Sequence, residues 1–152
     1  MPVFDFKFNV EAPLQAVSDF HFEPGILKTL TPPLMIMKVH KFEPLADGSI
    51  GEFTMWMGPI SVYWKAVHSN VSVTGFTDTQ AKGPLKTWAH THRFSAVSES
   101  VTEVHEHIEF EHFAGFKGFW SRLMFPKPAL LVLFHIRKWI TQREVAKRIS
   151  AS

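Results

Sequence analysis

The chain has 152 residues, 45% of them hydrophobic, and a net charge of +2 at neutral pH. A chain of this length fits one domain, so we expect a single domain over residues 1–152 that buries about two-thirds of its unfolded surface. It contains no cysteine, which excludes disulfides, thiolate catalysis and cysteine-ligated metal sites.

Residues 1–33 predict a strand followed by two short helices. Residues 3–10, VFDFKFNV, alternate apolar and polar side chains, a pattern typical of a half-buried strand. Pro13 then suits the first position of a helix, where its missing N–H costs nothing. A second short helix over PGILKTL should end at Thr31-Pro32-Pro33, because proline interrupts helical hydrogen bonding.

Residues 34–112 predict about six strands in succession. They are separated by turn signals such as ADGS and Gly58-Pro59. Neighbouring strands joined by short turns favour an antiparallel meander. Together with the first strand, this predicts a sheet of about seven strands.

The last part of the chain predicts an apolar loop and then a long helix. Residues 114–126, AGFKGFWSRLMFP, are too apolar for an ordinary surface loop, so we expect a lid that covers something. From Pro128 the pattern predicts a helix of about 22 residues, roughly 33 Å long. The expected fold is α+β: a curved antiparallel sheet wrapped around a long C-terminal helix, with two short helices after the first strand.

Two strands on either side of VSES should form a hairpin, and two registers are open to it. One register would gather four histidines: His90, His92, His105 and His107. In the other, slipped by one residue, His92 faces Glu106 and Trp88 faces Phe110. We predict the second register, because a slip of one residue turns every side chain to the other face and only this register keeps the apolar groups together.

In that register His90, His92 and Glu106 are polar groups on the concave face, and several roles remain open for them. They could pair structurally, since buried polar groups need partners. They could contact a ligand, or His92 could act as a general acid or base poised by Glu106. A metal would need a third ligand, for which the inward-facing His68 is the candidate. Asp78 is either a strand-end carboxylate or an acid at the mouth of a cavity.

Several motifs, in order along the chain, resemble one superfamily. They are Pro13, LTPP at 30–33, Phe76 with Asp78 before Gly83-Pro84, Trp88-x-His90-x-His92-x-Phe94, the alternation from Thr102 to Phe110, and Phe134-x-x-Arg137. This order resembles the START-like (SRPBCC) helix-grip superfamily, in its bacterial polyketide cyclase/dehydrase-like branch. The resemblance implies an apolar cavity between the sheet and the long helix. It does not imply one activity, because binding proteins and enzymes share this fold.

The predicted function is binding of a small hydrophobic or amphipathic ligand in that cavity. The alternative is a cyclase or dehydratase acting on an aromatic or polyketide-like substrate, with His92 and Glu106 as catalytic candidates. A third possibility is an accessory protein whose cavity is filled by its own side chains. The predicted cavity residues are Trp64, His68, Trp88, His90, His92, Phe94, Glu106, Ile108, Phe110, Phe119, Leu133 and Ile136.

We expect no metal, no other cofactor and no nucleic-acid partner. The basic residues near the C-terminus are too dispersed for a phosphate-binding patch and fit a solvated helix face. The longest apolar run is far shorter than the ~20 residues of a membrane span, so we expect no stable membrane insertion. The first residues lack a signal-peptide pattern, so we expect a cytoplasmic protein. The sequence specifies no oligomeric state.

Overall fold

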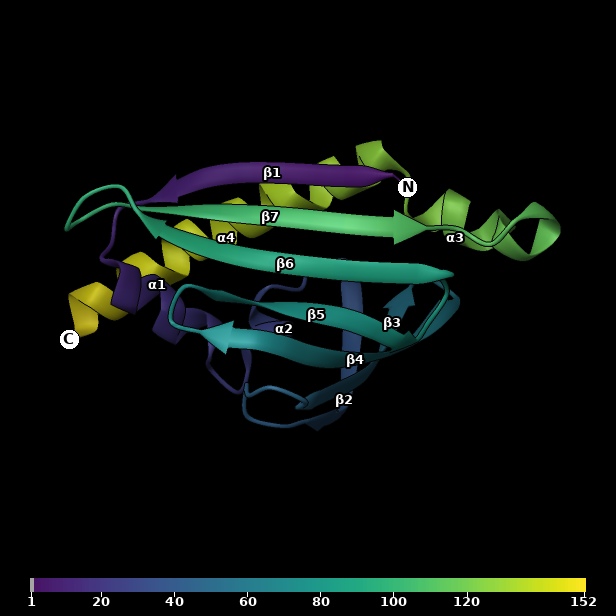
Figure 1. Ribbon diagram of the computed structural model, residues 1–152, viewed down its shortest axis with the longest axis horizontal. Coiled ribbons are helices and arrows are strands. Elements are labelled where there is room, and N and C mark those ends of the chain that lie inside the picture. Colours follow the sequence, from purple (N-terminus) through teal and green to yellow (C-terminus); the bar gives the residue numbers. More distant parts are fainter. Residues whose placement is uncertain (1) are drawn as a thin grey trace.

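A computed structural model describes residues 2–152 and contains one curved sheet of seven antiparallel strands, ordered β1-β7-β6-β5-β4-β3-β2 (Figure 1). The strands are β1 (Val3–Val10), β2 (Met35–Phe42), β3 (Ile50–Met57), β4 (Ile60–Ser72), β5 (Gly75–Lys82), β6 (Thr87–Ala96) and β7 (Thr102–Glu111). Strands β2 to β7 follow one another as a meander, and only β1 crosses over, to pair with β7. The predicted sheet is therefore confirmed.

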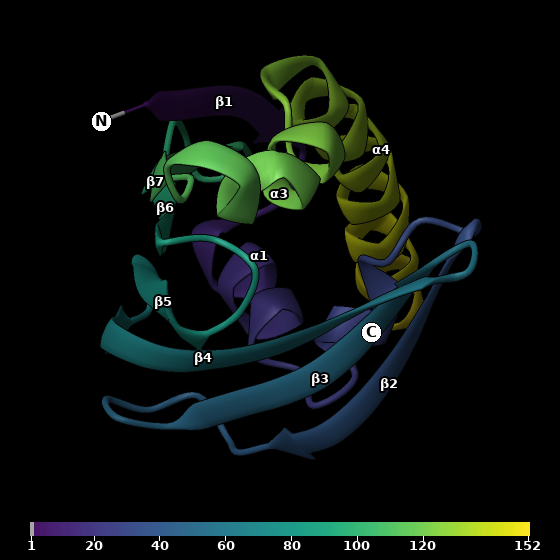
Figure 2. The ribbon, with the colours of Figure 1, turned by 90° about the vertical axis from the view of Figure 1, so that its right-hand side faces the viewer.

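The helices lie within the curve of this sheet. Helices α1 (Leu14–His21) and α2 (Ile26–Thr29) follow the first strand, and α4 (Lys127–Ala151) closes the chain. Figure 2 shows α4 running across the opening of the curved sheet, with α1 deeper in the concave side. This is the expected α+β helix-grip architecture, and it leaves the inner faces of the central strands turned toward α4.

The β6–β7 hairpin has the register that the apolar pattern predicts. His92 pairs with Glu106 and Trp88 pairs with Phe110. The alternative cluster of four histidines does not form, because His105 and His107 lie on the outer face beside Asp5 of β1. The apolar partners of the hairpin are thus buried together, and its inward polar groups meet on one patch of the concave face.

Two apolar clusters fill the space between the sheet and the helices. One surrounds Trp64, Trp88 and Phe134, and the other surrounds Phe20, Phe94 and Val145. Phe134 of α4 packs against Phe4 of β1, with ring centroids 5.4 Å apart, and so ties the helix to the sheet edge. The polar groups of the concave face lie between these clusters. Because these polar groups are buried on both sides, any of them without a hydrogen-bond partner would lower the stability of the fold.

The segment predicted as an apolar lid is short, helical and turned outward. It forms the 3-10 helix η1 (Gly115–Gly118) and helix α3 (Phe119–Met124), which extend beyond the end of β7 in Figure 1. Phe116 is 87% exposed, and Phe119 stacks on it rather than on the cavity. Only Phe125, just after α3, is buried in the main core, and Met124 packs partly buried against it. The prediction that this apolar segment covers the site was wrong for most of its side chains.

Among helices in the described part of the chain, none combines the length and the apolar character that a membrane crossing requires.

Candidate functional site

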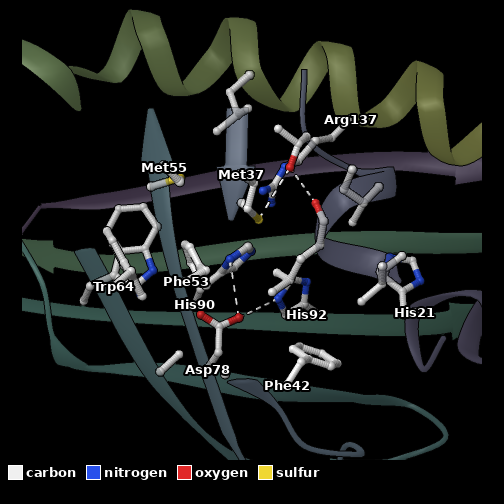
Figure 3. A pocket seen from close by; sticks show the side chains of 18 of the residues that line it. His21, Met37, Phe42, Phe53, Met55, Trp64, Asp78, His90, His92 and Arg137 are labelled. Atoms are coloured by element: carbon white, nitrogen blue, oxygen red, sulfur yellow. Dashed lines mark hydrogen bonds and ion pairs between the residues drawn. The ribbon is translucent and has the colours of Figure 1, made fainter. Parts of the chain in front are cut away.

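A cavity of about 150 Å³ lies between the concave face of the sheet and α4. Its wall is mostly apolar and is formed by side chains of α1, α2, strands β2 to β6 and α4. The aromatic side chains of Phe53, Trp64 and Trp88 and the thioethers of Met37 and Met55 contribute much of this wall (Figure 3). Such walls suit an apolar guest, because they offer it no competing hydrogen bonds.

Half of the predicted cavity residues line this space. They are Trp64, His68, Trp88, His90, His92 and Leu133. The alternation of β4 and β6 brings the first five to one side of the sheet, as a strand period of two requires, and Leu133 faces them from α4. His68 points inward, as predicted, and its Nδ1 lies 3.0 Å from the hydroxyl of Ser49, within hydrogen-bond distance.

The remaining predicted residues do not line the cavity. Phe94, Ile108 and Phe110 lie on the concave side of the sheet, as predicted, but they are packed within the core. Ile136 packs against the second cluster, and Phe119 is on the outer surface because α3 turns outward. Sequence periodicity assigns a side chain to a face. It does not distinguish a core position from a cavity wall.

Glu106 lies behind two histidines of the wall rather than in it. Its Oε2 is 2.6 Å from His90 Nε2 and 2.9 Å from His92 Nδ1. The contact with His90 is a hydrogen bond. The contact with His92 has the distance of an ion pair, but the N–H direction is not that of a hydrogen bond. Glu106 therefore positions both imidazoles from β7.

Asp78 of β5 completes this cluster from the other side. His92 Nε2 donates a hydrogen bond to Asp78 Oδ2 at 2.9 Å, and His90 Nδ1 lies 3.9 Å from the same oxygen (Figure 3). Asp78 is thus an inward-facing residue of the middle of β5 and not a strand-end carboxylate. Its buried neighbour Phe76 has the same parity on the strand, which was the sequence signal for this orientation.

The carboxylates separate the pKa values of the two histidines. Burial alone would lower the pKa of His92, but the charge of Glu106 and the hydrogen bond to Asp78 outweigh it and raise the pKa of His92 to about 9. His90 has a lowered pKa, because burial and the neighbouring charge of His92 outweigh the attraction of Glu106. At neutral pH the cluster therefore pairs an imidazolium at His92 with a neutral imidazole at His90.

The two carboxylates remain ionised for the same reason. Burial acts to raise the pKa of Asp78 and of Glu106, yet their histidine partners lower both, and that of Glu106 falls well below its usual range. His21 of α1 lies beside the cluster, and burial lowers its pKa to about 4, so it is neutral. His21 Nδ1 donates to the carbonyl oxygen of Val17 at 2.8 Å.

Arg137 of α4 also lines the cavity, and the predicted set of cavity residues omitted it. It lies three residues after the buried Phe134, a spacing that keeps two side chains on one helix face. Burial lowers its pKa, although the charges of Glu106 and Asp78 partly oppose this. In Figure 3 Arg137 enters from the side of α4, opposite the strands that carry Asp78 and the two histidines.

Two groups of side chains have donor atoms close enough to hold a metal ion. One is Asp78 with His90 and His92, and the other is Asp5 with His105 and His107 on the outer face. In the inner group the third donor is Asp78, whereas His68 was the candidate third ligand from the sequence. A proton competes strongly with a metal for His92, since its pKa is raised to about 9 and metal binding requires neutral imidazole.

The inner cluster has the components of acid–base chemistry. A neutral imidazole and an imidazolium whose rings are 3.9 Å apart face the same cavity. Groups whose environments drive their pKa values apart are suited to act as a base and an acid. The same cluster also satisfies the polar groups that burial would otherwise leave unpaired.

Solved structures resemble this one over nearly the whole chain. An aromatase/cyclase of Streptomyces sp. R1128 matches with a TM-score of 0.79 and 12% identity, covering 97% of this chain and 95% of that one. A protein of Chromobacterium violaceum matches with a TM-score of 0.75 and 11% identity, covering 94% and 96% of the two chains. A protein of Thermus thermophilus matches with a TM-score of 0.67 and 14% identity, covering 94% and 99%.

No protein-family model matches the chain, and no curated protein matches it by sequence. The structural likeness nevertheless extends over whole chains with high TM-scores. The chain therefore has the helix-grip fold, the architecture that its motif order had indicated.

Proposed function

We propose that this protein binds a small hydrophobic or amphipathic molecule in the cavity between the sheet and α4. The observation that carries the proposal is the cavity itself, whose mostly apolar wall includes one compact polar cluster. Well-formed apolar pockets with a few converging polar groups are the usual binding sites of small molecules. The third sequence-based possibility, a cavity filled by its own side chains, has less support because the wall encloses about 150 Å³ of free space.

The size of the cavity limits the guest. An engineered apolar cavity of about the same volume binds benzene. We therefore expect a guest of about one aromatic ring with a short substituent to fit without rearrangement. A larger guest would have to displace side chains of the wall, such as the flexible Met37 and Met55.

Native mass spectrometry of freshly purified protein is the first test, because a small molecule retained from the cell would appear as a defined mass difference. A thermal-shift screen with fatty acids, flavonoids and small aromatic acids and alcohols is the second. A ligand present at 100 times its dissociation constant should stabilise the fold by about 2.7 kcal/mol. If no compound is retained and none shifts the melting temperature, the binding function is refuted.

Catalysis on an aromatic or polyketide-like substrate is the second candidate function. It is favoured by the neutral His90 and the protonated His92, which both face the cavity. It is also favoured by the likeness to a solved aromatase/cyclase. In this alternative His90 accepts a proton and His92 donates one, while Glu106 and Asp78 position the two rings.

A change in the substrate distinguishes the two functions. A cyclase or dehydratase should convert a poly-β-carbonyl or β-hydroxyketone substrate into a dehydrated product, which mass spectrometry detects as the loss of water. His90→Gln should abolish this turnover and leave binding measurable. Binding of the same compounds without turnover would support the carrier function and count against the enzyme.

A further inference from the structure

The guanidinium of Arg137 is the one polar group of the cavity wall that the cluster of acids and histidines leaves without a direct partner. Among residues 2–152, the side chain of Arg137 forms no hydrogen bond or ion pair, and its Nε atom is buried and unpaired. Buried donors of native proteins nearly always have a partner, so an unpaired one requires an explanation. The residue as a whole is half-buried, and it lines the cavity.

The neighbouring acids do not supply that partner. Asp78 accepts a hydrogen bond from His92, and Glu106 accepts one from His90. Their charges reach Arg137 from a distance and offset only part of the cost of its burial, so its pKa is lowered. The guanidinium carbon of Arg137 lies 5.4 Å from the centroid of the Phe134 ring, which is a cation–π contact. The ring accepts no directed hydrogen bond from the Nε–H.

Structural roles explain arginines elsewhere in the chain but not here. Arg148 donates two hydrogen bonds to Glu23 and so ties α4 to the turn after α1. Arg122 donates to the carbonyl oxygens of Phe113 and Gly115. Arg137 has none of these contacts, although an apolar side chain of similar volume would fill its place at lower cost. Binding sites are where proteins retain such locally unfavourable groups.

We propose that Arg137 is the anchor for a carboxylate group of the ligand, and that the ligand is a small aromatic or branched carboxylic acid. This inference rests on the proposed binding function and names the chemical class of its ligand. The planar guanidinium presents parallel N–H donors that match the two oxygens of a carboxylate. The apolar part of the acid lies against the aromatic wall formed by Phe53, Trp64 and Trp88.

The charges around the cavity permit this ligand. Asp78 and Glu106 carry two negative charges, while His92 and Arg137 carry two positive charges, so these four groups together are neutral. An incoming carboxylate therefore meets no net negative charge from them. It finds donors without an adjacent carboxylate at Arg137, whereas His92 Nε2 donates to Asp78 and His92 Nδ1, which makes no hydrogen bond, lies 2.9 Å from the carboxylate of Glu106.

The experiment compares an acid with its isosteric neutral amide on variants of one helix position. The probes are 3-phenylpropanoate and 3-phenylpropanamide, and binding is measured by calorimetry and by the fluorescence of Trp64 and Trp88. The variants are Arg137→Met, which keeps an apolar stem, and Arg137→Lys, which keeps the charge but loses the planar donors. Lys138→Met is the matched control, because it removes the same charge from the next residue, which does not line the cavity.

We expect the wild type to bind the acid about tenfold or more tightly than the amide, the range of a charge-assisted hydrogen bond. Arg137→Met should remove this preference, Arg137→Lys should retain part of it, and Lys138→Met should retain all of it. Equal binding of acid and amide by the wild type overturns the inference without any variant, so the test does not depend on Arg137→Met folding. If neither probe nor any compound of the wider screen binds, the proposed binding function itself has failed.

Discussion

His92 Nε2 lies 2.9 Å from Asp78 Oδ2, a hydrogen bond that joins β6 to β5 on the buried side of the sheet. On its other side the same ring lies 2.9 Å from Glu106 of β7. One imidazolium thus connects three neighbouring strands. This arrangement makes the protonation state of His92 a determinant of stability.

Stability should therefore fall at alkaline pH. The pKa of His92 is raised from 6.5 in the unfolded chain to about 9 in the fold, so its contribution is complete below pH 6.5 and is lost as the pH rises through 9. The difference between these two pKa values limits the loss of unfolding free energy to about 3 kcal/mol. Denaturation of the wild type and of His92→Gln between pH 6 and 10 should show that the variant lacks this decline.

His107→Gln is the control for that measurement. The pKa of His107 is also raised, by hydrogen bonds to Asp5 and Glu109, but this cluster is exposed on the outer face. Exposed ion pairs contribute little because water screens them. An alkaline decline that disappears in His107→Gln and persists in His92→Gln would contradict the assignment.

Acidic pH should destabilise the fold through His21. Its pKa is lowered by burial to about 4, so the native state disfavours the proton that the unfolded chain binds at pH 6.5. The stability that depends on neutral His21 is present above pH 6.5 and lost as the pH falls toward 4. His21→Phe should reduce the loss between pH 6.5 and 4.5, measured as the shift in the urea midpoint. An unchanged pH dependence would show that His21 is not protonated on unfolding.

Replacement of Glu106 should be among the most costly changes in the sheet. Glu106→Leu leaves His90 without its hydrogen-bond acceptor and His92 without a counter-charge, and should cost about 3 kcal/mol of unfolding free energy. Glu106→Gln keeps an acceptor and should cost less. The exposed Glu109→Leu, on the outer face of β7, should change stability by less than about 0.5 kcal/mol. Comparable losses for Glu106 and Glu109 in chemical denaturation would refute the buried cluster.

The outward orientation of the segment before α4 predicts a contrast between two phenylalanines. Phe116 is 87% exposed, so Phe116→Ala should change stability by less than about 0.5 kcal/mol. Phe125 is 9% exposed and packs with Trp64 and Trp88, so Phe125→Ala should cost about 3 kcal/mol. Thermal denaturation of both variants decides the matter. A costly Phe116→Ala would restore the lid that the sequence predicted.

Gly75 should be intolerant of a side chain because of its place beside the cluster. Its φ is +137°, and an added Cβ would lie 1.9 Å from the backbone oxygen of His92. Gly75→Ala should cost at least about 2 kcal/mol and disturb the β5–β6 pairing. At Gly25 an added Cβ meets no atom within 4 Å, so Gly25→Ala should cost about 1 kcal/mol or less. Similar melting temperatures for the two variants would contradict this backbone arrangement.

The sequence by itself determined the order of the strands and of α1, α2 and α4, and the register of the β6–β7 hairpin. Both depend on local periodicity. In a strand with one buried face, a slip of one residue would expose every apolar side chain, so the pattern around Trp88 and Phe94 permits one register only. The same argument placed His92 opposite Glu106. The interruption of helical hydrogen bonding at Pro32 and Pro33 set the end of the short helices.

Only the tertiary structure decided which polar groups meet in the cavity. Asp78 joins the histidines because β5 pairs with β6, and Arg137 enters from α4, which crosses the sheet far from β6 in the sequence. The outward turn of α3 was decided in the same way: its apolar residues are compatible with a lid or with an exposed surface, and periodicity cannot separate the two. Such contacts depend on how distant elements pack in space, a relationship that spacing along one strand or helix does not record.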